Sequence, residues 1–352
     1  MSEPSFPLTF GLDTFGDLTS ENGVPSTHAQ TIRDIVEQGV VAEQVGLDFF
    51  GIGEHHTNDW PMPAADVALA AIAARTSRIH VGSAVTVLSS DDPVRVFQRF
   101  STLNAISNGR AEVVLGRGSS IESFPLFGYD LADYEELFEE KTALFAEIVK
   151  GGPVTWRGRM RPPLNGQDIV PHLDAPLPVS IGVGGSPHSV LRAARHGFNL
   201  MLAIIGGQPA RFAPFSQLFI QALAKLDKPR LPIGVHSPGH VAETDERAKE
   251  EFWPVYRDII AKIGPSRGFP PPTPEFFERE VGPRGALYVG SPETVAMKIA
   301  TNLPVLSANR FDLKHGMPGM SQAVLLRSIE LFGTEVVPRA KELLENAPVL
   351  PG

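Results

Sequence analysis

An acidic residue and two histidines, Glu54-His55-His56, follow directly after a mostly apolar run at 47–53. The run predicts a buried strand, so the triplet would lie just past its C-terminal end, where parallel α/β proteins gather ligands and chemistry. Imidazole titrates close to neutral pH, which makes His55 and His56 candidates for proton transfer. A simpler interpretation, loop histidines with structural hydrogen bonds, fits the triplet as well.

A second candidate site is the turn Gly184-Gly185-Ser186, which follows an expected strand at 179–183 and precedes an expected helix. Glycines let backbone N–H groups approach an anion closely, and a helix N-terminus adds a favourable dipole. Ser186 could cap the helix or donate to a phosphate, and Ser189 lies one turn further on. A capped turn that binds no ligand would have the same sequence.

Arg117 stands between Gly116 and Gly118 at the end of the expected fourth strand. A guanidinium at this place needs a partner, and a phosphate suits its bidentate geometry. The alternative is an ion pair within the protein, to Glu112 or Glu122.

Other chemistries lack their motifs. The absence of cysteine excludes disulfides, thiolate metal sites and a cysteine nucleophile, and the absence of a G-x-S-x-G elbow disfavours a serine hydrolase. Asp91-Asp92 could suggest a metal, but Asp92 before Pro93 is typical of a helix N-cap. No metal-ligand spacing appears on any expected helix, so we predict no metal site.

The composition limits which classes of partner and which cellular compartment we expect for this protein. The 352 residues are 42% hydrophobic with a formal net charge of −9, and no basic block is present, which disfavours nucleic acid and anionic membranes as partners. The first residues carry neither a basic nor an apolar targeting segment, and the most apolar run, 198–205, is too short to span a bilayer. We therefore expect a cytoplasmic protein.

Short apolar runs alternate with longer amphipathic ones along the chain. This alternation favours a (β/α)8 TIM barrel, formed as one domain over 1–352. A doubly wound open sheet is the second possibility, but its Gly-rich fingerprint is missing after the first strand. The expected strands are 8–13, 47–53, 79–88, 111–115, 179–183, 199–204, 231–241 and 310–313, and the expected helices are 27–45, 64–75, 93–106, 133–149, 187–196, 209–226 and 321–344.

Two segments interrupt the alternation, at about 151–178 and 242–285. The first is rich in glycine and proline, and the second holds a polar helix followed by a proline-rich stretch. We expect both as insertions at the C-terminal rim of the barrel, and the second as a lid.

Motifs in a fixed order run through nearly the whole chain. They lie at 54–56, 81–88, 92–95, 103–110, 115–118, 127–128, 183–197, 289–295 and 331–332. Together they resemble the bacterial luciferase-like flavin monooxygenases, and several ordered motifs are more specific than any single one. The resemblance implies a TIM barrel that binds a flavin at its C-terminal rim.

The resemblance also implies roles for residues near the flavin ring. The ring would pack on the third strand at Ala84, Val85 and Thr86, and the peptide bond between Ala84 and Val85 would be cis. His55 matches the histidine with an acid–base role in the luciferases, and His56 would be its supporting neighbour.

The flavin phosphate would bind at the other candidate sites. By resemblance, Arg117 and the turn with Gly184, Gly185, Ser186 and Ser189 would hold it. The chain departs from luciferase in two places: Gly116 stands where luciferase has a reactive cysteine, which argues against light emission, and Gly185 replaces an acidic residue.

The implied reaction is a monooxygenation that uses O2 and reduced FMN supplied by a separate flavin reductase, on a small apolar substrate. The alternatives are a deazaflavin-dependent hydride transfer and a flavin-binding protein without catalysis. The resemblance further implies a homodimer that uses the helices at 64–75 and 93–106. Aromatic residues that could line the mouth are Phe15, Trp60, Phe124, Phe127, Trp156 and Phe269.

Overall fold

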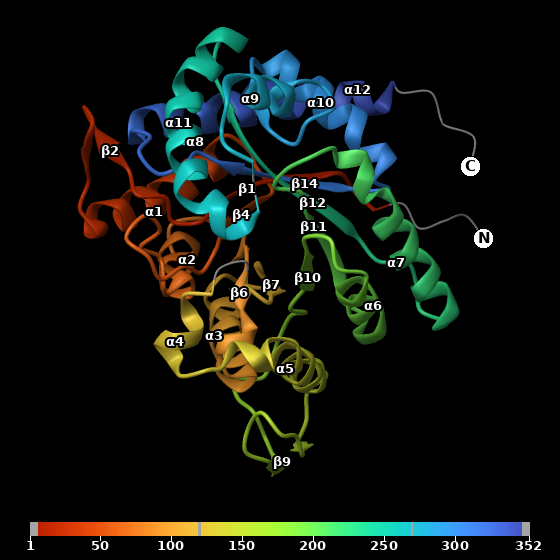
Figure 1. The fold of residues 1–352 in the computed structure, drawn as a ribbon. Helices are drawn as coiled ribbons and strands as arrows, with labels where there is room; N and C mark the ends of the chain where they lie inside the picture. The colour runs from red at the N-terminus through yellow and green to blue at the C-terminus, as the bar shows by residue number, and fades with distance from the viewer. Residues whose placement is uncertain (1–5, 119–120, 269, 347–352) are drawn as a thin grey trace.

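The computed structural model describes residues 6–118, 121–268 and 270–346, and its centre is a closed parallel barrel. The barrel strands are β1 (Thr9–Thr14), β4 (Phe49–Ile52), β5 (His80–Ser83), β7 (Ala111–Gly116), β10 (Val179–Val183), β11 (Asn199–Ala203), β12 (Ile233–Val241) and β14 (Arg310–His315). Neighbours pair in the order β10, β11, β12, β14, β1, β4, β5 and β7, and β7 pairs back to β10. This closure confirms the predicted (β/α)8 barrel and excludes the open sheet (Figure 1).

Helices surround the barrel (Figure 1). They are α1 (His28–Gln44), α2 (Ala65–Ala73), α3 (Pro93–Ile106), α4 (Ser123–Phe127), α5 (Tyr134–Ile148), α6 (Pro187–His196), α7 (Ala213–Lys225), α8 (Asp245–Arg267), α9 (Pro274–Val281), α10 (Pro292–Val305), α11 (Gln322–Leu331) and α12 (Val337–Glu345). The expected helices are present, but β13 (Tyr288–Gly290), α4, α9 and α10 were not predicted as elements. A strand of three residues is too short to show a periodic pattern.

Local capping fixes where several helices begin. The Asp92 carboxylate accepts hydrogen bonds from the N–H groups of Val94 and Arg95, at 2.9 and 3.4 Å, and Pro93 occupies the first turn of α3. The predicted N-cap is therefore confirmed, and it satisfies N–H groups that would otherwise lack a partner in the helix.

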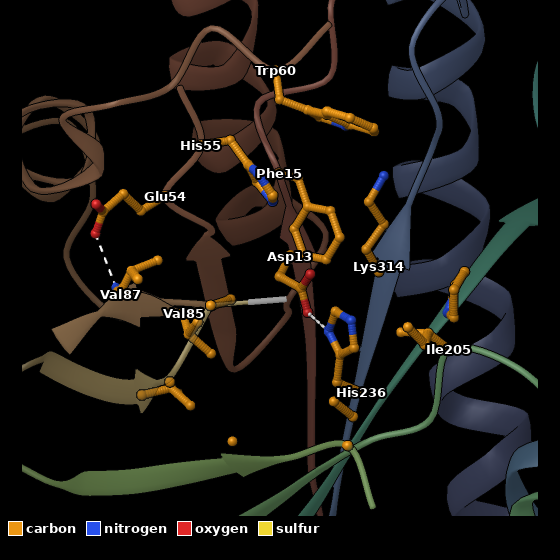
Figure 2. Close-up of a pocket in the computed structure, with 18 of the residues that line it drawn as sticks. Asp13, Phe15, Glu54, His55, Trp60, Val85, Val87, Ile205, His236 and Lys314 are labelled. Carbon is orange, nitrogen blue, oxygen red and sulfur yellow. Dashed lines mark hydrogen bonds and ion pairs between the residues drawn. The ribbon is translucent and has the colours of Figure 1, made fainter. Parts of the chain in front are cut away.

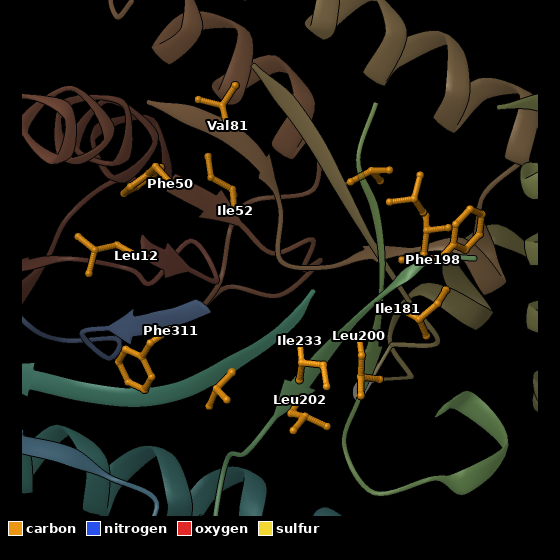
Figure 3. Close-up of a cluster of buried hydrophobic side chains, with 14 of the residues drawn as sticks. Leu12, Phe50, Ile52, Val81, Ile181, Phe198, Leu200, Leu202, Ile233 and Phe311 are labelled. Carbon is orange, nitrogen blue, oxygen red and sulfur yellow. The ribbon is translucent and has the colours of Figure 1, made fainter. Parts of the chain in front are cut away.

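Side chains alternate between the inside and the outside of the barrel along each strand. Leu12 and Phe311 belong to the apolar layer between strands and helices (Figure 3), whereas Asp13 and Asp312, the next residues along, line the interior cavity. The outer layer is almost wholly apolar and provides the main core. Polar residues are concentrated inside, where a ligand could meet them.

The predicted third strand is divided in two. β5 ends at Ser83, and β6 (Thr86–Val87) continues after a cis peptide bond between Ala84 and Val85. A short 3₁₀ turn at Leu88–Ser90 then leads into α3. Both pieces pair with β7, so the chain bends at the mouth of the barrel without leaving the sheet.

The first insertion, 151–178, lies beside α3 and α5. It forms the antiparallel pair β8 (Val154–Trp156) and β9 (Leu164–Gln167), and the Ala175 carbonyl accepts a hydrogen bond of 2.9 Å from Nδ2 of Asn104 on α3. No residue of this segment is among those that line the central cavity. The segment connects the end of α5 to the start of β10, and Nε of Arg161 within it donates to the carboxylate of Asp92, the N-cap of α3, at 3.0 Å.

The second insertion, 242–285, is largely helical and lies at the rim. α8 runs without a break through Pro254 and through Pro265, the residue at which the sequence suggested that the proline-rich stretch begins, and ends at Arg267. Phe252 and Tyr256 of α8 pack on Phe277 of α9 in a hydrophobic cluster separate from the barrel core. This packing holds α8 in place along the cavity. No helix in the described part of the chain is both long and apolar enough to cross a bilayer.

Candidate functional site

A cavity of about 480 Å³ opens at the C-terminal ends of the barrel strands. Its volume is in the range typical of small-molecule sites. The strand ends and the loops that follow them form the floor and one side (Figure 2), and α8 contributes an apolar wall. The side chains of that wall are Tyr256, Ile259, Ile260 and Ile263.

His55 borders this cavity with its ring held on several sides. Its Nδ1 lies 2.9 Å from Oε1 of Glu122, and its ring lies 5.2 Å from the ring of Phe15 and 5.4 Å from that of Trp60. A carboxylate only accepts hydrogen bonds, so Nδ1 carries the proton and Nε2 is the nitrogen left for a ligand. His55 is 7% exposed, which keeps most water from the ring.

The neighbouring histidine has a different partner. His56 Nε2 lies 2.9 Å from Oε1 of Glu54, whose Oε2 accepts a hydrogen bond of 3.0 Å from the N–H of Val87. The N–H of Glu54 in turn donates to the Val85 carbonyl at 3.0 Å. Glu54 and His56 thus fasten the triplet to the bend between β5 and β6, although both also border the cavity.

The bend itself faces the cavity through Ala84 and Val85, and its peptide bond is cis, as the family resemblance implied. Thr86 is buried in β6 and does not line the cavity, unlike the prediction for it. A Cβ atom on Gly116 would lie 2.4 Å from Cγ2 of Val85, so the Val85 side chain fills the space that a larger residue would need.

Arg117 forms an ion pair with Glu135, and its guanidinium lies 5.3 Å from the centre of the Tyr134 ring. The two partners suggested by the sequence are engaged elsewhere, Glu122 with His55 and Glu112 with Arg310. Glu135 is largely exposed, and exposed ion pairs contribute little to stability, so an anion in the cavity could compete for Arg117.

Gly184, Gly185 and Ser186 line the cavity where α6 begins. Gly185 has a φ of +128°, which favours glycine, and nothing lies within 4 Å of the place where its Cβ would be. The Ser186 side chain makes no capping hydrogen bond to α6, so its hydroxyl is not used by the helix. Ser189, predicted to help, is instead buried and accepts a hydrogen bond of 3.3 Å from Arg192.

A third histidine–carboxylate pair at the cavity was missed by the sequence analysis. His236 Nδ1 lies 2.6 Å from Oδ2 of Asp13, and both residues are buried and line the cavity (Figure 2). Nearby, the Lys314 ammonium donates to both carboxylate oxygens of Asp17, at 2.7 and 2.8 Å. Charged residues inside otherwise apolar strands were the signal that could have found them.

Beneath these pairs the barrel holds a buried charged layer. The Arg310 guanidinium lies between the carboxylates of Glu112 and Asp312, at 2.6 and 2.9 Å. Burial raises the pKa of Asp312 to about 6 in spite of this cation. For Glu112, burial acts in the same direction, but Arg310 and His80 outweigh it and lower the pKa to about 2.

Comparison with known proteins places this architecture in a family. The sequence model for luciferase-like monooxygenases matches residues 14–304. The F420-dependent glucose-6-phosphate dehydrogenase of Amycolatopsis mediterranei is 30% identical over 162 residues, which are 44% of this chain and 48% of that protein. The alkanal monooxygenase alpha chain of Photorhabdus luminescens is 26% identical over 188 residues, 51% of this chain and 50% of that protein. The chain thus matches about half the length of these curated relatives.

Solved structures show the same fold at low sequence identity. The monooxygenase RslO1 of Streptomyces bottropensis superposes with a TM-score of 0.82 at 18% identity, covering 94% of this chain and 99% of that one. The oxygenating constituent of 3,6-diketocamphane monooxygenase from Pseudomonas putida, solved with FMN, gives 0.75 at 19% identity, covering 94% and 98%. The family match spans most of the chain, and the chain therefore belongs to the luciferase-like monooxygenase family.

Proposed function

We propose that this protein is a flavin-dependent monooxygenase that uses reduced FMN and O2 to oxidise a small, largely apolar molecule. The observation that carries the proposal is His55, which Glu122 holds at 2.9 Å on the wall of a cavity of about 480 Å³. A buried, oriented imidazole beside a cavity is the arrangement that proton transfer to or from a reacting group requires.

The residues around the cavity suit a flavin phosphate. The hydroxyl of Ser186, the open backbone at Gly185 and the N-terminus of α6 converge at one place, and Arg117 lies on the same cavity. Backbone N–H groups at a helix N-terminus favour an anion. We infer that these residues would hold the phosphate, while Val85 would support the ring.

The flavin, when bound, supplies the electrons and the reaction with O2, and the chain supplies the surroundings. His55 would hold or move a proton through its Nε2 atom. Phe15, Trp60 and the isoleucines of α8 exclude water from the cavity, which protects a reaction that water would divert.

Some of the aromatic residues that we expected at the mouth of the cavity line it, and others lie elsewhere. Phe15 and Trp60 line it, and Phe127 is exposed with its ring against His56. Phe124 is buried outside the cavity lining, Trp156 lies on β8 in the first insertion, and Phe269 lies outside the described residues. The apolar lining supports a small apolar substrate.

A deazaflavin-dependent hydride transfer is the second candidate. It is favoured by the 30% identity to an F420-dependent dehydrogenase, and the same cavity and the same histidine could serve it. A flavin-binding protein without catalysis gives no reason for the His55–Glu122 pair, so we place it third.

The proposed partners are a flavin reductase and a second copy of the chain. The α2 and α3 helices would form the dimer interface, and Val67 on α2 and Ile106 on α3 are apolar and exposed. A molecular mass by light scattering decides this point, and the mass of a monomer would contradict the dimer.

The deciding experiment is an anaerobic fluorescence titration of the purified protein with reduced FMN and, separately, with a deazaflavin. We expect reduced FMN to bind more tightly, and the loaded protein to consume O2 when oxygen is admitted. Tighter deazaflavin binding without O2 consumption would move the assignment to hydride transfer. Binding of neither would contradict a flavin site.

A further inference from the structure

The Asp13–His236 pair lies in the cavity on the other side of Phe15 from His55. The His236 ring is stacked on the Phe15 ring at 5.7 Å with an interplanar angle of 20°, and the His55 ring lies 5.2 Å from the same ring. The Lys314 ammonium also lies over the Phe15 ring, 5.1 Å from its centre. Phe15 therefore separates two histidine–carboxylate pairs, only one of which the proposed function uses. Asp13 and His236 are 1% and 6% exposed, so the second pair is buried from water.

The geometry of this pair fixes which nitrogen can meet a ligand. Asp13 accepts the hydrogen bond, so the proton on Nδ1 of His236 is committed to Oδ2 at 2.6 Å. Figure 2 shows the other ring nitrogen turned away from Asp13. Within the described part of the chain, the hydrogen bond of the His236 ring is made by Nδ1, and Oδ1 of Asp13 is a buried oxygen without a partner.

The neighbouring charged groups are all engaged with the protein. Lys314 donates to Asp17 and to the Gly316 carbonyl, and Asp312 is paired with Arg310. Nε2 of His236 is thus a ring nitrogen beside the cavity to which the described residues offer no hydrogen bond, so an atom of a ligand can take that place.

The surroundings of His236 describe the rest of the ligand. Met201 in β11 and Ile205, just beyond the end of that strand, line the cavity, and the isoleucines of α8 line the facing wall. These side chains offer dispersion contacts and exclude water, but they form no hydrogen bonds. A ligand seated here needs one polar atom for His236 and an apolar body for the remainder.

We propose that His236, oriented by Asp13, binds the oxygen atom of the substrate and so sets which end of the substrate points away from His55. The substrate class is then a compact hydrocarbon skeleton that carries one carbonyl or hydroxyl oxygen. The proposal rests on the proposed function for the identity of this molecule as a substrate, whereas the binding preference itself can be measured without a flavin. His236 is a substrate-binding residue in this scheme, and Asp13 is a positioning residue.

The test compares three ligands with the same ring, namely cyclooctanone, cyclooctanol and methylenecyclooctane. Their dissociation constants are measured on the purified protein by ligand-observed NMR. We expect the ketone or the alcohol to bind about tenfold more tightly than the hydrocarbon, because only an oxygen satisfies Nε2 of His236. Preference for the alcohol identifies Nε2 as an acceptor, as in a neutral ring whose proton is on Nδ1. Preference for the ketone identifies Nε2 as a donor, which requires a ring protonated on both nitrogens.

Variants of His236 then test whether this residue causes the tighter binding of the oxygen compounds. In His236→Leu the oxygen compounds should lose their advantage while the hydrocarbon binds as before, and His236→Gln, which keeps a polar group, should retain part of it. The matched control is His172→Gln, because His172 pairs with Asp168 at 2.9 Å on the exposed first insertion, far from the cavity lining. Thermal unfolding of each variant shows that it is folded.

Asp13 could orient His236 or merely stabilise the fold, and a measurement of the His236 tautomer distinguishes these two roles. ¹⁵N NMR of the His236 ring should show the proton on Nδ1 in the wild type and a shift of the tautomer in Asp13→Asn. An unchanged tautomer would refute the positioning role.

Three results would overturn the binding role: equal affinity for all three ligands in the wild type, an oxygen preference that survives in His236→Leu, or no binding of any ligand. The anaerobic flavin titration of the same variants keeps the two proposals apart. Loss of flavin binding throughout, with the oxygen preference intact, would refute the monooxygenase and leave the His236 site standing.

Discussion

His55 and His236 are each bound to a carboxylate through Nδ1, at 2.9 and 2.6 Å, and this common detail shapes what either residue can do. A carboxylate that accepts from one ring nitrogen fixes the tautomer and the orientation of the ring. Both rings also contact Phe15, so neither is free to rotate. Of the histidines that line the cavity, these two therefore have fixed roles for their Nε2 atoms.

At the residue scale, we predict that His55→Gln lowers substrate turnover by about 100-fold or more, the usual size of a general acid–base contribution. Flavin affinity should stay within about threefold of the wild type, because the residues proposed to hold the phosphate are elsewhere in the cavity. Turnover is measured by O2 consumption, with His172→Gln as the control. Turnover close to the wild-type rate would show that His55 is not the acid–base residue.

Gly116 illustrates why a single residue can depart from the family pattern without loss of the site. Because Val85 Cγ2 lies 2.4 Å from where a Cβ would stand, the reactive cysteine of luciferase could not fit here unless Val85 moved. The departure reflects packing at the bend between β5 and β6 and leaves the cavity open to a ligand.

At the scale of elements, α8 gives the cavity its apolar wall, and α9 holds α8 in position. The end of α9 is fastened by Lys298 on α10, whose ammonium shares its three N–H donors among four backbone carbonyls, of Glu280, Val281, Gly282 and Leu287, at 2.7 to 3.3 Å. Burial lowers the pKa of Lys298 to about 7. Lys262 near the end of α8 also forms an ion pair with Asp59, in the loop after the histidines.

We predict that Lys298→Met lowers the free energy of unfolding by about 2–4 kcal/mol, because the carbonyls lose the three N–H donors of the ammonium and each hydrogen bond is worth about 1 kcal/mol net. Amide hydrogen exchange should accelerate most in α9 and α8. Urea denaturation measures the stability, and Lys249→Met, which removes a more exposed ion pair to α9, should cost less than about 1 kcal/mol. Equal costs for the two variants would contradict the bracing role of Lys298.

At the scale of the whole molecule, the barrel separates an apolar outer layer from a polar interior. One buried polar side chain lacks the hydrogen bonds that such a group usually has. His315 at the end of β14 is 2% exposed, and neither of its ring nitrogens has a hydrogen-bond partner within the described residues. Burial, together with the neighbouring Lys314 cation, lowers its pKa from 6.5 to about 3. The folded protein therefore holds this imidazole neutral.

We predict that His315 makes the fold sensitive to acid. Between pH 6.5 and about 3 the unfolded chain binds a proton at His315 that the folded chain does not, so stability falls as the pH is lowered through this window. The slope from this group is at most about 1.4 kcal/mol per pH unit. Denaturation curves at several pH values should show a shallower loss for His315→Leu than for the wild type, and an unchanged one for His172→Gln. Parallel loss in all three proteins would assign acid sensitivity to other groups.

Much of the architecture could be predicted from the sequence, because local patterns determine local structure. The alternation of apolar runs and amphipathic helices predicted all eight barrel strands, and the Asp92-Pro93 pair predicted where α3 begins. The ordered motifs identified the family, the cis bond at Ala84–Val85, and a cluster of rim residues that the structure places on one cavity. Such features depend on residues close together in the chain, so the sequence alone carries them.

The pairing of residues distant in the chain was decided by the tertiary structure alone. Glu122 lies 67 positions from His55, and Asp13 lies 223 positions from His236, so no local pattern could choose these partners. Arg117 paired with Glu135 and not with either residue suggested by the sequence, because the direction of a long side chain depends on which elements pack around it. Closure of the barrel brings these residues together, and with them the position of α8 that completes the cavity.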